Sequence, residues 1–378
     1  MGTLHGRCGA IRSSANPPGP VSGGAGQPGT IANDLDEIID RAAGGLRRLA
    51  GKTVLVAGGA GFLPSYLVDS LAHANEQLLE QPCRILSVDN LSTGVAGRLE
   101  HLSGRDDVVF LERDLVKGVE LDERVDYVVH AASIASPSWY RQRPLETIDV
   151  NVVGTRRLLE LAREQEVEGF VYLSSSEIYG DPPPDRVPTT EDYWGHVSST
   201  GPRSCYDESK RLAESLCMTY FRLYGVPVKL IRPFNVYGPR LRLDDGRVIP
   251  DFLSDALNGR PITLYSDGRV TRSFCYITDF VTALILLLVA AVAGEAYNVG
   301  NDREVTIRDV AETVAKLSRD GAGIRFASSD DPDYLTDNPN RRSPDLRKTK
   351  ATVDWSPIVG LEEGLRRTYD SYREQEGR

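Results

Sequence analysis

The sequence predicts an α/β fold with a doubly wound parallel sheet and a smaller, interleaved C-terminal domain. Short apolar runs alternate with stretches of helical periodicity between residues 52 and 238, and connections of that length between apolar strands fit parallel pairing. Beyond residue 238 the pattern becomes irregular, which predicts a second part built from mixed short elements. The six expected strands are Thr53–Ala57, Arg84–Val88, Val108–Leu111, Tyr127–Ala131, Phe170–Ser174 and Val228–Arg232.

The segment before the first strand divides into a tail and a helix. Residues 1–30 are rich in glycine and proline and lack acidic residues, a composition that predicts a disordered tail. Within residues 31–50, apolar side chains recur at helical spacing after Asn33, which we expect to be the N-cap of a short amphipathic helix. The domain boundaries that follow are 51–237, with parts of 273–300, for the sheet domain and mainly 238–378 for the second domain.

Composition and charge exclude several classes of partner. The chain has 378 residues and a net charge of −10, which disfavours binding to a nucleic-acid backbone. The five cysteines and five histidines show no metal-ligand spacing, so we expect neither a disulfide framework nor a bound metal. The longest apolar run, residues 280–294, is too short to span a bilayer and predicts a buried helix. Without a secretory signal pattern, we expect a cytoplasmic protein that binds no membrane.

A glycine-rich turn follows the first expected strand in "VLVAGGAGFLPSYLVDSL". Gly58 and Gly61 stand between strand and helix, where glycines let a pyrophosphate approach the helix N-terminus. Asp89 ends the next strand, where a carboxylate accepts both ribose hydroxyls and repels a 2′-phosphate. The pattern predicts a Rossmann-type domain that binds NAD rather than NADP. Pro64 departs from it at the third glycine position, and we expect altered packing there.

Tyr206 and Lys210 lie four residues apart on one face of an expected helix. That spacing alone also fits a pair facing solvent. The strand that ends near Ser174 can, however, bring Ser175 beside the Tyr206 hydroxyl at the edge of the sheet. A neighbouring ammonium group and a cationic nicotinamide would lower the tyrosine pKa from about 10 toward neutrality. Tyr206 would then be a general base that removes a hydroxyl proton while hydride leaves the same carbon.

Over about residues 50–370 the chain resembles the extended short-chain dehydrogenase/reductase family, which includes nucleotide-sugar epimerases, dehydratases and decarboxylases. The motifs that carry the resemblance, in the order of the family, are "GGAGFL", "VDNLSTG", "HAAS", "NVVGT", "SSSEIYG", "YDESK" and "RPFNVYGPR". Within the family, "EDYWGHVSSTGPRSCYDESKR", "LDDGRVIPDFL" and "VTRSFCYITD" are most similar to UDP-glucuronate decarboxylases.

The resemblance implies roles for individual residues. Ser175, Tyr206 and Lys210 would form the dehydrogenase set, and the implied catalytic residues are Ser175, Ser176, Glu177, Tyr206, Lys210 and Arg272. The implied NAD-binding residues are Gly58, Gly61, Phe62, Leu63, Asp89, Asn90, Asp114, Leu115, Ala131, Ala132, Asn151, Tyr206 and Lys210. The implied residues for a UDP-sugar substrate are Tyr140, Asn235, Arg247, Arg272 and Arg342. We expect Arg247, Arg272 and Arg342 to converge on one cleft, because guanidinium groups bind phosphate oxygens in pairs.

The family shares oxidation of the sugar at C4, and the residues after Ser175 separate its later reactions. Related 4,6-dehydratases carry an Asp–Glu pair there, whereas this chain has Ser176–Glu177. A C5 carboxylate beside a C4 ketone loses carbon dioxide without such an acid. The resemblance therefore favours NAD-dependent decarboxylation of UDP-glucuronic acid to UDP-xylose, to the UDP-4-keto-pentose, or to both. Glu177 would order a water or control protonation at C5, with Arg272 assisting; alternatively, it only holds the loop.

Two other hypotheses stay open. The chain fits a 4,6-dehydratase or 4-epimerase of another nucleotide hexose, and Pro64 fits a non-catalytic NAD-binding protein. Two segments also depart from the decarboxylase pattern: Ser138 and Trp139 stand where a Pro–Asn pair usually precedes the tyrosine, and "YLTDNPN" before Arg341 looks like an insertion. Finally, the family implies a homodimer through a four-helix bundle, here from residues 151–163 and 206–223.

Overall fold

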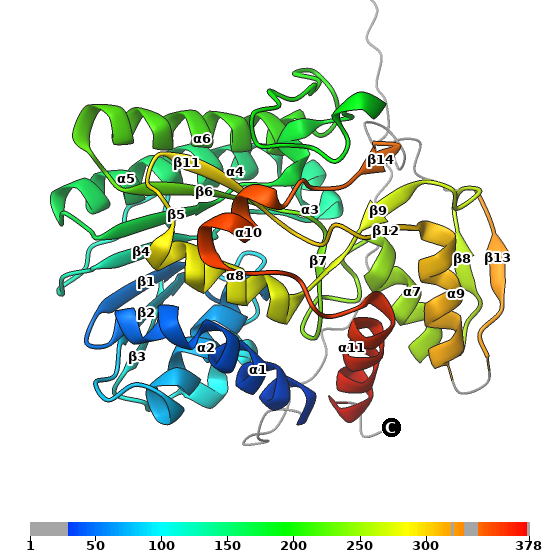
Figure 1. The fold of residues 1–378 in the computed structure, drawn as a ribbon, viewed down its shortest axis with the longest axis horizontal. Coiled ribbons are helices and arrows are strands. Elements are labelled where there is room, and N and C mark those ends of the chain that lie inside the picture. Colours follow the sequence, from blue (N-terminus) through cyan, green and yellow to red (C-terminus); the bar gives the residue numbers. More distant parts are fainter. Residues whose placement is uncertain (1–28, 319–320, 329–338, 376–378) are drawn as a thin grey trace, which may run out of the picture.

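A computed structural model describes residues 29–318, 321–328 and 339–375. Its centre is a parallel sheet of seven strands in the order β11-β6-β5-β4-β1-β2-β3 (Figure 1). The six strands expected from the sequence are confirmed, and no end differs by more than one residue. The strands are β1 (Thr53–Ala57), β2 (Arg84–Asp89), β3 (Val108–Glu112), β4 (Tyr127–His130), β5 (Gly169–Leu173), β6 (Val228–Pro233) and β11 (Glu295–Val299).

Helices cover both faces of the sheet, as a doubly wound fold requires (Figure 1). Alternate residues of β1 enter different cores: Val54 and Val56 pack with one set of helices, Leu55 and Ala57 with the other. The first set is α1 (Gly29–Leu46), α2 (Phe62–Gln77) and α8 (Ile277–Ala290), and the second is α5 (Thr155–Glu164) and α6 (Ser204–Tyr224). α8 is the buried helix predicted from the long apolar run. No described helix is long and apolar enough to cross a membrane.

The second part of the chain lies beyond the carboxyl ends of the sheet strands (Figure 1). Its helices are α7 (Val248–Leu257), α9 (Ile307–Leu317) and α11 (Leu361–Gln375), and α10 (Arg347–Val353) packs on α8. Its strands are β7 (Val236–Tyr237), β8 (Ile262–Leu264), β9 (Thr271–Ser273), β10 (Cys275–Tyr276), β12 (Glu304–Thr306), β13 (Ile324–Phe326) and β14 (Arg341–Arg342). Two short helices, α3 (Pro137–Gln142) and α4 (Pro144–Asp149), follow β4. Most of the "YLTDNPN" segment lies outside the described residues.

The start of α1 corrects two predictions. The helix begins at Gly29, so Asn33 lies inside it and is not its N-cap, and residues 29 and 30 do not belong to a tail. Residues 1–28 of the predicted tail lie outside the described residues. The earlier start has a tertiary cause, because buried Ile31 extends the apolar stripe and Thr30 Oγ1 donates to Glu374 Oε1 of α11 at 3.3 Å. Sequence spacing within the helix could not show these contacts.

α1 carries a fully buried carboxyl group, Asp34. Its Oδ2 accepts hydrogen bonds from the hydroxyls of Tyr276, at 2.8 Å, and Tyr66, at 3.3 Å. Its Oδ1 accepts one from Arg367 of α11 at 3.3 Å. Burial outweighs these bonds and raises the pKa of Asp34 to about 7. The carboxyl group therefore links α1 to α2, α11 and the segment before α8 through hydrogen bonds. Its ionised form is unfavourable there because the site is buried.

We predict that Asp34→Asn gains stability relative to the wild type as pH rises from 5 to 8. The folded protein holds the Asp34 proton up to about pH 7, whereas the unfolded chain releases it near 3.8. Wild-type stability must therefore fall across this window, and asparagine removes the dependence. Thermal unfolding of both proteins, with the exposed Asp40→Asn as a control on the same helix, measures this. A difference in melting temperature that does not change with pH, or that changes in the opposite direction, would contradict the prediction.

Candidate active site

The glycine-rich turn joins β1 to α2 and leaves its backbone open. Gly58 has a φ of +84°, and a Cβ there would lie 2.7 Å from the backbone of Ala132, so only glycine fits. Gly61 is the N-cap of α2, and its amide donates to the Gly58 carbonyl at 2.8 Å. Pro64 lies buried in the first turn of α2 and does not interrupt the helix. The turn therefore presents a helix N-terminus to a ligand despite the missing third glycine.

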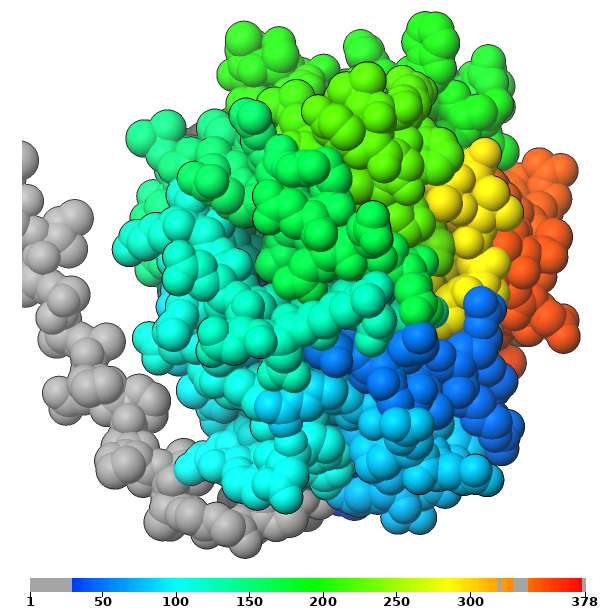
Figure 2. Space-filling view, turned by 90° about the vertical axis from the view of Figure 1, so that its left-hand side faces the viewer, coloured from blue at the N-terminus to red at the C-terminus, as the bar shows by residue number. Residues whose placement is uncertain are grey.

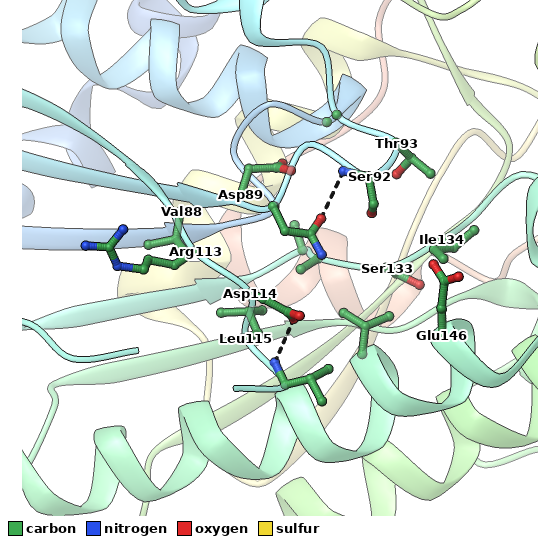
Figure 3. A pocket seen from close by; sticks show the side chains of 18 of the residues that line it. Val88, Asp89, Ser92, Thr93, Arg113, Asp114, Leu115, Ser133, Ile134 and Glu146 are labelled. Carbon is green, nitrogen blue, oxygen red and sulfur yellow. Dashed lines mark hydrogen bonds between the residues drawn. The ribbon is translucent and has the colours of Figure 1, made fainter. Parts of the chain in front are cut away.

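Asp89 borders a pocket beside this turn. Its carboxylate accepts the amides of Ala60 at 3.0 Å and Leu91 at 2.8 Å, and burial raises its pKa. Figure 3 shows Asp89 and Asp114 on one side of the pocket and Ile134 and Glu146 on the other. The predicted cofactor residues that line it are Gly58, Gly61, Asp89, Asn90, Asp114, Leu115, Ala131 and Ala132.

Asn151 is not among the residues that line that pocket, and its contact with the cofactor stays a prediction. Asn151 is fully buried in a π-helical turn, Val150–Gly154, and its Nδ2 donates to Ser209 Oγ of α6 at 2.8 Å. This bond holds the side chain against α6. π-Turns often mark functional sites, and here the turn fixes α6, the helix that carries Tyr206 and Lys210.

A second cavity adjoins the first at Gly61, and Phe62 and Leu63 line it. The residues after β5 and the start of α6 form its other wall with Ser175, Ser176, Glu177, Tyr206 and Lys210. The Tyr206 hydroxyl is hydrogen-bonded to the Ser175 side chain. The structure thus brings the predicted dehydrogenase set together beside the glycine-rich turn.

Burial changes the pKa values of Tyr206 and Lys210 in opposite directions. It raises the pKa of Tyr206 to about 12 and lowers that of Lys210 to about 7. Lys210 Nζ donates to the Leu173 carbonyl at 2.8 Å and lies 5.8 Å from the Tyr206 ring centre. Desolvation thus dominates the pKa of Tyr206 in the protein alone, whereas the expected lowering is for the ammonium group together with a cationic nicotinamide. Any lowering must come from a further positive charge brought into the cavity.

A third cavity continues from the second into the C-terminal part. Tyr140, Glu177, Asn235 and Arg247 line both cavities, and Arg272 and Arg342 line the third. The three arginines expected to converge therefore do lie on one cavity. Arg247 is paired with Asp245, and Asn235 Nδ2 donates to the Ser273 carbonyl at 3.0 Å. Burial and the neighbouring Arg342 lower the pKa of Arg272 to about 9.

Glu177 binds two arginines, one of which the sequence analysis missed. Arg342 Nη2 donates to Glu177 Oε2 at 2.7 Å, Arg342 Nη1 donates to Oε1, and Arg203 Nη2 also donates to Oε2. Burial alone would raise the pKa of Glu177, but the two guanidinium groups outweigh it and lower the pKa to about 2. The two arginines thus favour the ionised form of Glu177, which accepts hydrogen bonds in this arrangement. Arg203 could have been noticed at the start of α6, one turn before Tyr206, in the quoted segment "GPRSCYDESK".

Comparisons with known proteins agree with this geometry. The model of the NAD dependent epimerase/dehydratase family matches residues 54–300. UDP-glucuronic acid decarboxylase 1 of Xenopus tropicalis is 38% identical over 324 residues, which cover 86% of this chain and 73% of the relative. An epimerase structure from Methanothermobacter thermautotrophicus has a TM-score of 0.76 and 29% identity, covering 91% of this chain and 97% of that one. A Bacillus cereus UDP-glucuronic acid 4-epimerase variant, solved with NAD and UDP-4-deoxy-4-fluoro-glucuronic acid, has a TM-score of 0.71 and 26% identity, covering 85% and 99%.

Proposed function

Because the chain belongs to the NAD-dependent epimerase/dehydratase family, we propose that it decarboxylates UDP-glucuronic acid with NAD as its cofactor. Its similarity to UDP-glucuronic acid decarboxylases extends over 86% of its length. The observation that carries the proposal is the Ser176–Glu177 pair, in which the one carboxylate is held ionised between two arginines beside Tyr206. The product is UDP-xylose, or the UDP-4-keto-pentose where release comes early.

The residues around the glycine-rich turn fit NAD. The absence of a Cβ at Gly58 and the N-terminus of α2 suit a pyrophosphate, and Asp89 suits the adenosine ribose. Asp114 and Leu115 border the position of the adenine, and Lys210 the nicotinamide end. Asp89 also disfavours the 2′-phosphate of NADP. NAD held by these residues would supply the hydride acceptor for oxidation at C4 of the sugar.

Tyr206 removes the proton from the C4 hydroxyl. Its pKa of about 12 makes it a poor base near neutral pH while no further positive charge lies beside it. The charge of an oxidised nicotinamide would lower that pKa, so Tyr206 would act as a base in the loaded site. Ser175, hydrogen-bonded to Tyr206, orients the same oxygen.

The remaining steps occur on the substrate. Oxidation at C4 makes the C5 carboxylate part of a β-keto acid, and loss of carbon dioxide leaves an enolate whose oxygen lies beside Tyr206 and Ser175. No acid is needed for a leaving group. A 4,6-dehydratase would need one, and ionised Glu177 is unsuited to that role. Glu177 instead accepts hydrogen bonds and can order the water that protonates C5.

We further propose a homodimer formed through α5 and α6. The two helices pack on each other, and both lie in the upper half of the surface in Figure 2, below the segment that precedes α6. Leu212, Leu223 and Tyr224 of α6 are exposed there although they are large apolar side chains. A second copy would cover them in a four-helix bundle. Light scattering should give twice the chain mass of 41.5 kDa, and a monomeric mass at micromolar concentration would contradict the dimer.

Purified protein incubated with UDP-glucuronate and NAD should release carbon dioxide and form UDP-xylose or the 4-keto pentose, as seen by mass spectrometry. Tyr206→Phe should lower the rate of C4 oxidation at least 100-fold, because about that much depends on a positioned base. Formation of reduced nicotinamide in a single turnover measures that step. A product that retains the carboxylate carbon, or one that has lost water, would contradict the proposed decarboxylation.

Glu177→Gln should keep C4 oxidation within a few-fold of wild type and slow carbon dioxide release by about 10-fold or more. The neutral amide leaves the charges of Arg203 and Arg342 uncompensated, so they hold the substrate carboxylate more firmly before it reacts. KM for UDP-glucuronate should therefore fall together with kcat. Glu208→Gln, a carboxylate of α6 paired with Arg211, is the matched control. Wild-type rates of both steps in Glu177→Gln would exclude this role.

A further inference from the structure

Five buried polar atoms on the walls of the second and third cavities have no hydrogen-bond partner among the described residues. They are the hydroxyl oxygens of Ser133, Tyr140 and Ser174 and the Nε atoms of Arg203 and Arg342. Buried donors are rarely left without an acceptor, because the lost hydrogen bond to water costs free energy. Each of these atoms carries a hydrogen that it can donate in a hydrogen bond. Their common position indicates that a ligand rich in acceptor oxygens binds there.

Arg203 is the one of these two arginines that reaches the reacting end of the cleft. It lines both the second cavity, with Tyr206 and Ser175, and the third, whereas Arg342 lines the third alone. Its guanidinium group donates to Glu177, and its Nε lies 3.7 Å from Asp207 Oδ2. Only 13% of its side chain is exposed. The positive charge of Arg203 is thus poorly solvated and lies where the second cavity, which contains Tyr206, meets the third.

The same region is rigidly tied to Tyr206. The Arg203 carbonyl accepts the amides of Tyr206 and Asp207, each at 3.0 Å, which fixes the arginine at the start of α6. The Tyr140 ring stacks on the Tyr206 ring with centres 5.1 Å apart and planes 14° apart. The positions of the Arg203 guanidinium and the Tyr140 hydroxyl are therefore fixed relative to Tyr206, the base that acts at C4. A group attached to the neighbouring carbon C5 would lie close to these two side chains.

We propose that Arg203, together with the Tyr140 hydroxyl, recognises the C5 carboxylate of a nucleotide hexuronate and is the residue that selects it over a neutral hexose. This inference rests on the proposed function and deepens it. A carboxylate supplies the acceptor oxygens that the unpartnered donors lack, and a charge-assisted bond to arginine is stronger than a neutral one. The hydroxymethyl group of a neutral sugar offers neither the charge nor the second oxygen.

Glu177 keeps this recognition compatible with the reaction. When carbon dioxide leaves, the C5–C6 electron pair forms the C4–C5 enolate, negative charge moves to the C4 oxygen, and C5 then takes a proton from water. An arginine with its full charge on the carboxylate would stabilise the substrate more than the transition state. Because Glu177 shares Arg203, the arginine orients the carboxylate with a partly compensated charge. Recognition and reactivity thus depend on the same ion cluster.

The experiment compares binding of UDP-glucuronate and UDP-glucose to the NAD-loaded protein by calorimetry. Arg203→Met should weaken UDP-glucuronate binding by about 10- to 100-fold, the range expected for lost hydrogen bonds to a charged group, and UDP-glucose binding by less than about threefold. Arg203→Lys should recover part of the selectivity. Tyr140→Phe, which removes only the hydroxyl, should shift selectivity in the same direction by a smaller factor. Arg211→Met is the matched control. Arg211 is likewise an arginine of the α6 region that contacts the segment after β5, here through a hydrogen bond to the Ile178 carbonyl, but it does not line the cavities.

The outcomes separate the two proposals. If Arg203→Met weakens binding of both ligands by the same factor, so that the ratio of their affinities is unchanged, the proposed role of Arg203 is overturned and its role is purely structural. If the wild type binds UDP-glucuronate selectively but releases no carbon dioxide, the proposed function fails while the binding comparison still decides the role of Arg203. A wild type without preference for UDP-glucuronate overturns the inference directly.

Discussion

The ion cluster at Glu177 is the interaction on which the rest of the site depends. Glu177 follows β5, Arg203 precedes α6, and Arg342 belongs to β14 near the C-terminus, so one carboxylate connects three distant segments. Breaking either ion pair would leave a charge in a poorly solvated place, which is strongly unfavourable. The cluster therefore holds the C-terminal part against the carboxyl ends of the strands. All three residues line the third cavity, so the cluster joins the two parts of the chain at its wall.

Low solvation at the cleft also sets the protonation states of Tyr206 and Lys210. Burial keeps Tyr206 protonated and favours the neutral form of Lys210, so the protein alone does not hold a phenolate. In the proposed reaction, the charge of an oxidised nicotinamide would stabilise the phenolate. Deprotonation of the substrate would then depend on the presence of a hydride acceptor.

The sequence predicted the sheet well and the polar network less completely, for a physical reason. Buried strands such as β1 and β4 are continuous apolar runs, a local property that can be read without tertiary knowledge. The sequence pattern predicts Asn33 as a cap because such residues mark helix starts, but contacts between Thr30 and α11 set the start of α1 earlier. The hydrogen bonds of Asn151 and Arg203 depend on how distant segments pack together, which the local sequence does not show. Pairing of charges across 26 residues, as between Glu177 and Arg203, leaves no periodic signal.

The loop that departs from the decarboxylase pattern shows how such a difference is absorbed. The ring of Trp139 lies 5.1 Å from the Arg143 guanidinium and 5.3 Å from that of Arg242, so cations contact the residue from two segments. Ser136 Oγ donates to the Asp245 carbonyl at 2.8 Å, and Asp245 in turn pairs with Arg247. The loop thus supports the segment that presents Arg247 to the third cavity. Trp139 thus joins two segments of the chain through its cation contacts, and the neighbouring Tyr140 stacks on Tyr206.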